Sequence, residues 1–245
     1  MTTDQSSPID DERGLESSNS GASDGDGPDT ITLYADYVCP FCYLGRQSLE
    51  RYRETREEPL AIDWHPFDLR RGKRNPDGSI DHDVDDGKDD EYFEQARKNV
   101  RRLRERYDIE MVQDLAVDVD SYDAQLASLA VASAAPERWE AFDVAIYDAL
   151  WQDGRDIGDH DVLLEIADDA GVSGDVVREA LGSEDEDEDE SLRSRLEELF
   201  AEGGRAGVRG VPTFVYEGYA AQGAVPPEHL ERLVEGEDGA EVSKR

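Results

Sequence analysis

The sequence predicts an α/β fold in which a large all-helical insertion separates the two halves of a small sheet. Two apolar runs rich in β-branched and aromatic residues, at 31–35 and 60–64, flank a stretch with helical periodicity at about 40–55. From Lys88 onward the pattern is helical, until strand character returns at 210–216. Because a strand–helix–strand unit forms a right-handed parallel pair, we expect the first two strands to be neighbours.

Local signals support the elements on either side of the insertion. Pro40 suits the first turn of the first helix, because proline has no amide to lose there. Residues 70–87 are loop-like and contain the turn signal Asn-Pro-Asp-Gly. After the run at 210–216, Glu217 and Gly218 predict a turn into a short partner strand, which a final helix ending near Val234 follows.

The insertion carries its own helix boundaries. Ser121 and Asp159 are suited to cap helices, Pro136 to open one, and Gly203-Gly204 to end the last. The acidic run at 184–190 is unpatterned and leads into that last helix. We expect the apolar stripes to be core packing, with some residues lining a substrate groove. The stripes of two helices are Tyr92, Phe93, Ala96, Val100, Leu103 and Tyr107, and Trp139, Phe142, Ile146 and Leu150.

The 245 residues fit one domain with an insertion better than two independent domains. We expect residues 1–29 to be a disordered acidic tail and 236–245 a second tail. Residues 30–87 and 204–235 would form the sheet-containing domain, and 88–203 the helical insertion.

Charge restricts the partners. The chain has 61 acidic and 26 basic residues and a formal net charge of −35, and only four of the basic residues are lysines. A field this negative argues against nucleic acid and anionic membrane surfaces as partners. At molar salt the Debye length is about 3 Å, so self-repulsion would be screened. We therefore expect a high-salt interior, since the composition resembles acidic, lysine-poor proteins of halophilic archaea.

The N-terminal stretch indicates the compartment. Residues 1–28 lack the basic cluster, apolar core and twin arginine of secretory signals, and no stretch of the sequence approaches a membrane span. We expect a cytoplasmic protein, in which a Cys-x-x-Cys motif is more often catalytic than structural.

Cys39 and Cys42 are the only cysteines, and they lie where the first strand ends and the first helix begins. The unpaired amides of a helix's first turn are expected to point at the Cys39 sulfur and favour its thiolate, which is the attacking species. Cys42, one turn further in, is expected to be buried and able to resolve a mixed disulfide.

Three other interpretations of this pair compete. Zinc would need two more ligands, but the histidines are scattered and form no second pair at ligand spacing. A structural disulfide closing so short a loop would remove little chain entropy. Two merely buried thiols would not need to open a helix together. The four histidines are His65, His82, His160 and His229.

Two motifs carry a family resemblance. A strand leading into Cys39-Pro40-Phe41-Cys42, and Gly210-Val211-Pro212-Thr213-Phe214 opening a late strand, resemble the thioredoxin fold of the DsbA family, in which a helical insert separates two halves. The resemblance covers roughly residues 30–235. Three further segments resemble the cytosolic FrnE-type branch, which is grouped with the 2-hydroxychromene-2-carboxylate isomerases: Tyr34-Ala35-Asp36, Tyr43-Leu44-Gly45 and Trp64-His65-Pro66-Phe67.

The resemblance implies residue roles. Cys39 would be the attacking thiol, Cys42 the resolving thiol, and Pro212 a cis proline beside them, with the Val211 backbone pairing with a substrate strand by β-augmentation. Phe41 would contact substrate. His65 and Thr213 are candidate supporting residues, although the favoured interpretation of His65 is a histidine satisfied by backbone or water. No cofactor or metal is expected.

The chain departs from the strongly oxidising members of that family in one respect. Phe41 stands where those members have histidine, and phenylalanine donates neither a hydrogen bond nor a positive charge to a thiolate. We therefore expect a milder oxidant, or a reductase- or isomerase-like poise. Arg46, one turn beyond Cys42, could also favour the thiolate, but a solvated arginine on the helix surface is the expected state.

Together these observations predict a protein disulfide oxidoreductase. Its partners would be disulfide-containing proteins or low-molecular-weight thiols and a recycling reductant or oxidant, with a homodimer as one candidate assembly. Two alternatives stay open. One is a thiol-dependent isomerase of the 2-hydroxychromene-2-carboxylate type, which Cys39 argues against because that relative has serine there. The other is a redox-sensing or chaperone-like binder that uses the insertion as a groove.

Overall fold

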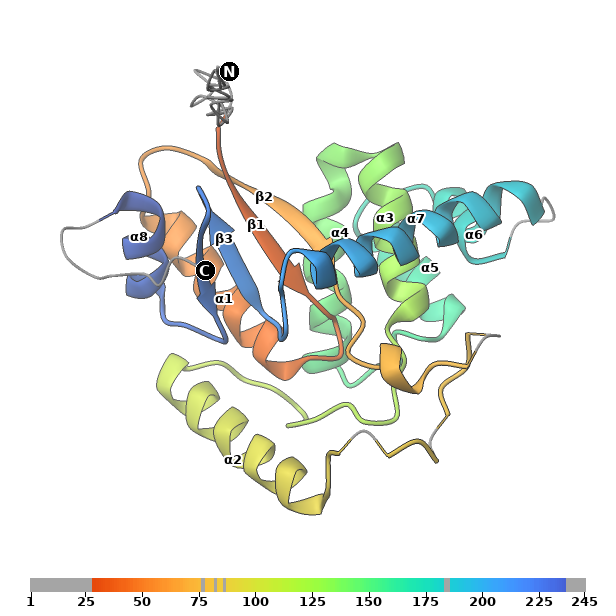
Figure 1. Ribbon diagram of the computed structural model, residues 1–245. Coiled ribbons are helices and arrows are strands. Elements are labelled where there is room, and N and C mark those ends of the chain that lie inside the picture. Colours follow the sequence, from red (N-terminus) through yellow and green to blue (C-terminus); the bar gives the residue numbers. More distant parts are fainter. Residues whose placement is uncertain (1–27, 76–77, 82, 86, 183–185, 237–245) are drawn as a thin grey trace, which may run out of the picture.

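A four-stranded sheet of order β2-β1-β3-β4 combines strands from the N-terminal and C-terminal parts of the chain (Figure 1). The computed structural model describes residues 28–75, 78–81, 83–85, 87–182 and 186–236. β1 is parallel to β2 and antiparallel to β3, which pairs antiparallel with β4. The expected pairing of the first two strands is therefore confirmed. The strands are β1 (Asp29–Ala35), β2 (Leu60–Pro66), β3 (Thr213–Tyr216) and β4 (Tyr219–Gln222).

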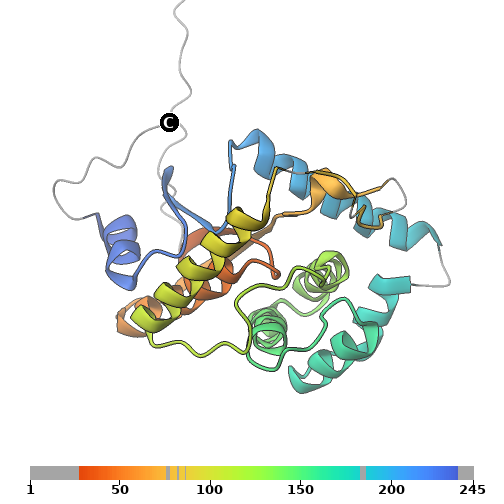
Figure 2. The ribbon, with the colours of Figure 1, turned by 90° about the horizontal axis from the view of Figure 1, so that it is seen from below.

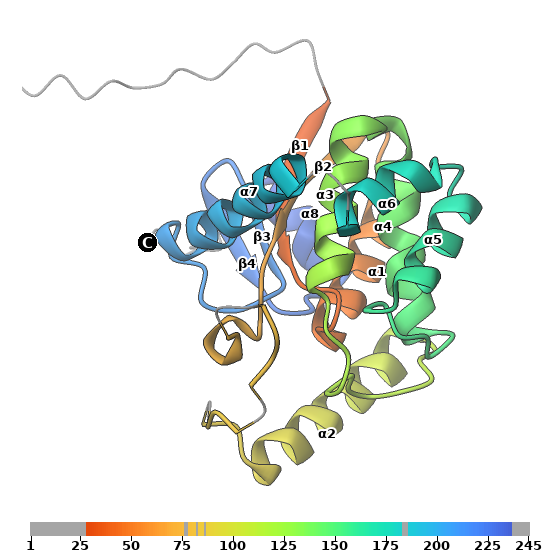
Figure 3. The same cartoon turned by 90° about the vertical axis from the view of Figure 1, so that its right-hand side faces the viewer.

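The two faces of the sheet are covered by different helices. Along β1 the side chains of Ile31, Leu33 and Ala35 alternate with those of Thr32 and Tyr34, and the first three are buried in the main core. α1 (Pro40–Thr55) and α8 (Pro227–Glu235) contact each other, and α8 also contacts β4. α7 (Glu186–Arg205) contacts β2 and lies in front of the sheet in Figure 3, whereas α8 lies behind it.

The insertion packs beside the sheet as a group of helices around α3 and α4 (Figure 3). α3 contacts α4, α6 and α7, and α4 also contacts α1. α2 lies apart from this group and crosses beneath α1 (Figure 2). The fold class is thus the predicted one, an α/β sheet with a helical insertion. The helices are α2 (Asp90–Tyr107), α3 (Tyr122–Ala134), α4 (Pro136–Trp151), α5 (His160–Asp169) and α6 (Gly174–Gly182), with a short 3-10 turn at Arg71–Lys73.

The expected apolar stripe of α2 is confirmed as core packing only toward its C-terminal end, where Val100 and Tyr107 belong to the main core and Leu103 packs against it. Val100 and Tyr107 are its only buried residues, whereas the side chain of Tyr92 is 51 % exposed. α2 contacts α1, and toward the N-terminal end of the stripe Phe93 and Ala96 are only partly buried. The hydroxyl of Tyr107 donates to the carbonyl of Ala224 at 2.7 Å and fixes the C-terminal end of α2.

The ends of several elements differ from those expected. β1 begins at Asp29, within the expected tail. α7 is already helical at Glu186, inside the acidic run, because glutamate forms helix well and negative charge favours a helix N-terminus. α7 also continues past Gly203-Gly204 to Arg205, and Gly207 follows it with a φ of +80°. Residues 1–27, 184–185 and 237–245 lie outside the described residues, and the division into domains stays a prediction.

Candidate thiol site

Cys39 is the N-cap residue of α1, with an extended backbone (φ −88°, ψ 113°), and Pro40 opens the helix as expected. The amides of Cys42 and Tyr43 donate to the Cys39 carbonyl at 3.0 and 3.2 Å. In the described chain the Cys39 side chain makes no capping hydrogen bond. The first-turn amide of Cys42 therefore bonds the Cys39 carbonyl and not the sulfur.

The Cys39 sulfur faces the loop that leads into β3. Its thiol donates to the carbonyl of Val211 with an Sγ–O distance of 3.7 Å. The Val211–Pro212 peptide bond is cis, as the resemblance implied. Thr213 stabilises the same loop, since its hydroxyl donates to the Gly210 carbonyl at 2.7 Å. The structure thus brings together residues that lie 172 positions apart in the chain.

Both cysteines are free thiols and both are buried, with Cys39 4 % and Cys42 0 % exposed. Burial raises the pKa of the Cys42 thiol well above its usual range, and the adjoining Cys39 sulfur raises it further. Phe41 is half-buried between the two and packs against the main core. The pair is therefore a reduced dithiol in which Cys39 faces the loop and Cys42 is enclosed.

A buried carboxylate precedes the cysteine pair. Asp36 is 1 % exposed and accepts hydrogen bonds from the hydroxyl of Ser121 at 2.5 Å and from the amides of Leu69 and Val38 at 2.9 and 3.2 Å. Burial raises its pKa to about 6, although these hydrogen bonds act in the opposite direction. Ser121 is the N-cap residue of α3, as expected, but its side chain makes no capping hydrogen bond to the helix backbone. Its hydroxyl donates to Asp36 and accepts from the side chain of Gln125 at 3.3 Å.

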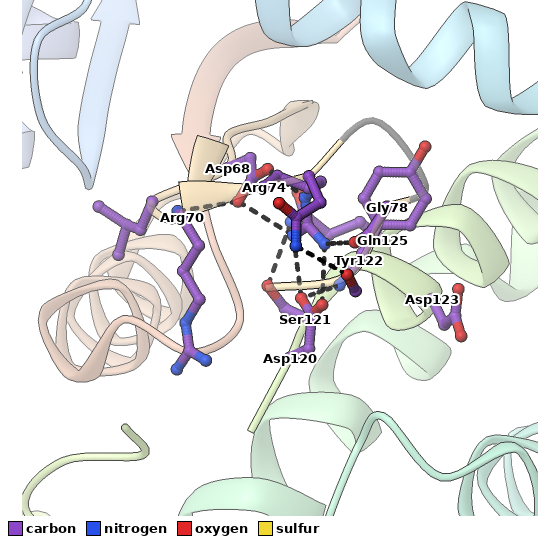
Figure 4. Close-up of polar contacts among 12 residues, drawn as sticks. Asp68, Arg70, Arg74, Gly78, Asp120, Ser121, Tyr122, Asp123 and Gln125 are labelled. Carbon is purple, nitrogen blue, oxygen red and sulfur yellow. Dashed lines mark hydrogen bonds and ion pairs between the residues drawn. The ribbon is translucent and has the colours of Figure 1, made fainter. Parts of the chain in front are cut away.

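Beside Asp36, an arginine joins the loop after β2 to the start of α3 (Figure 4). Arg74 donates from Nε to Asp68 at 3.0 Å and from Nη1 and Nη2 to Asp120 at 2.8 and 3.0 Å. Its guanidinium also lies over the ring of Tyr122, 4.7 Å from the centroid. These contacts hold the loop that supplies the Leu69 amide and line a cavity of about 780 Å³.

A second buried arginine, Arg46, joins α1 to α4. The residue is 2 % exposed, and its Nε lies 3.1 Å from Asp143 Oδ2. It also pairs with Glu50 and Glu140. The expectation of a solvated Arg46 is therefore wrong: α4 and its carboxylates cover this face of α1, which the residues around Arg46 did not indicate.

Among the described residues, His65 makes no hydrogen bond or ion pair with either cysteine. Its ring lies on that of Tyr34, with centroids 4.5 Å apart, and Nε2 is 3.6 Å from a carboxylate oxygen of Glu202 in α7. Nδ1 is 3.4 Å from the Pro66 carbonyl. These contacts favour the interpretation of His65 as a histidine satisfied by its surroundings.

No group of three or more His, Cys, Asp or Glu side chains in the described residues is placed to hold a metal ion. His82, one of the four histidines considered above, lies outside those residues. Among the helices that the structure describes, none is long and apolar enough to cross a membrane.

A sheet of order β2-β1-β3-β4, a helix opened by Cys-x-x-Cys and a cis proline facing it define a thioredoxin-like protein with an inserted helical segment. The chain belongs to the family of the DSBA-like thioredoxin domain, whose model matches residues 30–235.

Known proteins similar to this chain agree with that assignment. It is 25% identical over 216 residues to YwbO, an uncharacterized protein of Bacillus subtilis (strain 168), covering 84% of this chain and 96% of that protein. A 2-hydroxychromene-2-carboxylate isomerase has a similar structure, with a TM-score of 0.65 and 19% identity over 82% of this chain and 92% of that one. So does the cytosolic disulfide reductase DsbM of Pseudomonas aeruginosa, with a TM-score of 0.55 and 20% identity over 83% and 92%.

Proposed function

We propose that this chain is a thiol–disulfide oxidoreductase that exchanges disulfides through Cys39 and Cys42. The observation that carries the proposal is the 3.7 Å distance between the Cys39 sulfur and the Val211 carbonyl at a cis proline, with Cys42 enclosed one turn further along α1. A thiol with that position can exchange its contact with the loop for one with a substrate sulfur.

The exchange takes two steps, in each of which one sulfur–sulfur bond forms and one breaks. Cys39 thiolate attacks one sulfur of a substrate disulfide; the Cys39–substrate bond forms, and the other half leaves as a thiolate that takes up a proton. Cys42 thiolate then attacks the Cys39 sulfur; the intramolecular disulfide forms and the remaining half leaves as a second thiol. The substrate gains two electrons and two protons, and a thiol reductant must return them to the pair.

Substrate would bind along the loop before β3. The Val211 backbone can pair with an extended peptide, which gives affinity with little side-chain selectivity. Phe41, half-buried beside the cysteines, supplies an apolar contact. The hydrogen bond from Thr213 to Gly210 would keep this loop in place during exchange.

Two observations support reduction over strong oxidation. Phe41 offers neither a hydrogen bond nor a positive charge to a Cys39 thiolate, so this position does not stabilise the reduced form in the way a histidine would. The similar fold of a cytosolic disulfide reductase is consistent with this direction. We also propose a cytoplasmic, high-salt setting and membership of the FrnE-type branch, on the composition and motifs described above.

The test is insulin reduction by dithiothreitol in high KCl, with wild type, Cys39→Ser and Cys42→Ser. We expect catalysis by wild type only, and a substrate adduct trapped on Cys39 in the Cys42→Ser variant. Equal rates for wild type and Cys39→Ser would refute the proposal.

A second candidate is a thiol-dependent isomerase of the 2-hydroxychromene-2-carboxylate type, which the shared fold favours. In that case an external thiol would act at the position of Cys39. Isomerisation of such a substrate that survives Cys39→Ala, in the presence of a low-molecular-weight thiol, would support this candidate over the first.

A further inference from the structure

One face of α4 is directed at the cysteine pair. Asp143, Tyr147 and Trp151 follow one another at intervals of four residues, so their side chains lie on one side of the helix. All three are buried, with exposed fractions of 2 % or less.

The two outer residues of this face bond the segment that holds the cysteines. Asp143 accepts from the hydroxyl of Tyr37 at 3.0 Å and from Nε of Arg46 at 3.1 Å. Trp151 donates from its indole nitrogen to the Tyr37 carbonyl at 2.9 Å. Tyr37 lies two residues before Cys39, and Arg46 lies four residues after Cys42. This face of α4 therefore contacts the chain on both sides of the cysteine pair.

The middle residue, Tyr147, packs against both flanks of the motif. Its ring centroid is 4.8 Å from that of Tyr37 and 6.2 Å from that of Tyr43, which directly follows Cys42. Its hydroxyl is fully buried and has no hydrogen-bond partner among the described residues. A buried donor left unpaired destabilises a fold, so a tyrosine here is unfavourable for packing alone.

The direction of the Tyr147 pKa shift is consistent with a hydroxyl near the cysteine pair. Burial raises the pKa of Tyr147 well above its usual range, and the sulfurs of Cys42 and Cys39 are among the groups that raise it further. The hydroxyl therefore keeps its proton near two sulfurs that become negatively charged in turn.

We propose, on the basis of the function proposed above, that Tyr147 Oη donates a hydrogen bond to the Cys42 thiolate during resolution of the mixed disulfide. In the reduced pair the Cys42 thiol interacts with the Cys39 sulfur. Once Cys39 is bonded to substrate, that sulfur no longer carries charge, and Cys42 must ionise in an enclosed, apolar site. Tyr147 retains its proton throughout: it lowers the energy of the attacking thiolate and takes no part in the electron balance.

The two thiol steps can be separated with 5,5′-dithiobis(2-nitrobenzoate). Attack by Cys39 releases one coloured thiolate, and attack by Cys42 on the resulting mixed disulfide releases a second. In Tyr147→Phe, which keeps the ring and removes the hydroxyl, we expect the second release to be slower by about tenfold, the value of a hydrogen bond to a charged group. The first release should stay within about twofold.

The pH dependence distinguishes this role from packing. The pH at which the second release reaches half its maximum rate should rise by about one unit in Tyr147→Phe, which corresponds to the tenfold loss. The melting temperature should stay equal or rise, because the substitution removes an unpaired buried hydroxyl.

Tyr43→Phe is the matched control. Its hydroxyl already accepts from Gln152 at 2.8 Å, so we expect both releases to match wild type. A second release in Tyr147→Phe within twofold of wild type, or an equal slowing in Tyr43→Phe, would overturn the inference. A wild-type protein that reduces no disulfide would instead overturn the proposed function.

Discussion

Gly45 of α1 lies directly against the ring of Pro212: a Cβ at Gly45 would be 3.0 Å from Pro212 Cγ and 3.2 Å from Phe214 Cζ. Only glycine lets the helix that carries the cysteines approach the cis-proline loop this closely. The short distance from Cys39 to Val211 depends on that approach.

Gly45→Ala should therefore push α1, which carries the cysteines, away from the loop that contains Pro212. The added methyl group overpacks the contact with Pro212, and we expect a loss of about 1–3 kcal/mol in unfolding free energy, reduced in part by the better helix propensity of alanine. Disulfide exchange should slow as the loop moves. Chemical denaturation and insulin reduction measure the two effects.

Gly204→Ala is the control for that substitution. Gly204 also lies in a helix, but a Cβ there meets nothing within 4 Å. This variant should be neutral or more stable by about 0.5–1 kcal/mol, with unchanged exchange. Equal effects of the two substitutions would show that the Gly45–Pro212 contact is unimportant.

Asp36 should make stability pH-dependent. Its pKa is raised from 3.8 to about 6 in the fold, so the folded protein binds the proton more tightly than the unfolded chain. The stabilisation from protonated Asp36 is complete below about pH 4 and is lost as pH rises through 6, a change of about 3 kcal/mol. Between pH 4 and pH 7 the unfolding free energy of wild type should fall by about 3 kcal/mol more than that of Asp36→Asn, which lacks the titrating group. Parallel curves for the two proteins would contradict this prediction.

Breaking the buried pair of Arg46 and Asp143 should be costly. Arg46→Met leaves the carboxylate of Asp143 enclosed without its cation, and we expect about 3–5 kcal/mol of destabilisation. Arg178→Met, at an exposed pair with Asp175, should cost at most about 1 kcal/mol. Urea unfolding of both variants tests the contrast, and equal losses would contradict the role of burial.

Salt should stabilise the protein. With a net charge of −35, self-repulsion of the surface is large at low ionic strength and is screened at molar salt, where the Debye length is about 3 Å. The melting temperature should rise steadily with KCl. A melting temperature that falls with added KCl would contradict the high-salt interpretation.

The sequence identified the part of the site that local motifs encode. Cys39, Cys42 and Pro212 each lie in a short pattern whose physical meaning is local: a helix start or a strand entered through proline. Their meeting in space followed from the family resemblance, because no local rule predicts a cis bond or a contact across 172 positions.

The residues that the sequence did not identify, Ser121 and Tyr147, take their place in the site from contacts with other elements of the fold. Ser121 has the pattern of a helix cap, and only the fold shows that its hydroxyl reaches Asp36. In α4 the apolar positions 139, 142, 146 and 150 indicated one buried face, yet the face with Tyr147 is buried as well. The four-residue spacing of Tyr147 and Trp151 was the available signal, but a helix enclosed on two sides cannot be distinguished from an amphipathic one by such a stripe.

The near-complete enclosure of Cys39, 4 % exposed, also limits which reagents reach it. Peroxides oxidise thiols according to access as well as thiolate content, so this enclosure should slow over-oxidation of Cys39 relative to its exchange with disulfides. A disulfide partner that pairs with the Val211 backbone and replaces its contact with the Cys39 thiol gains access that a peroxide does not.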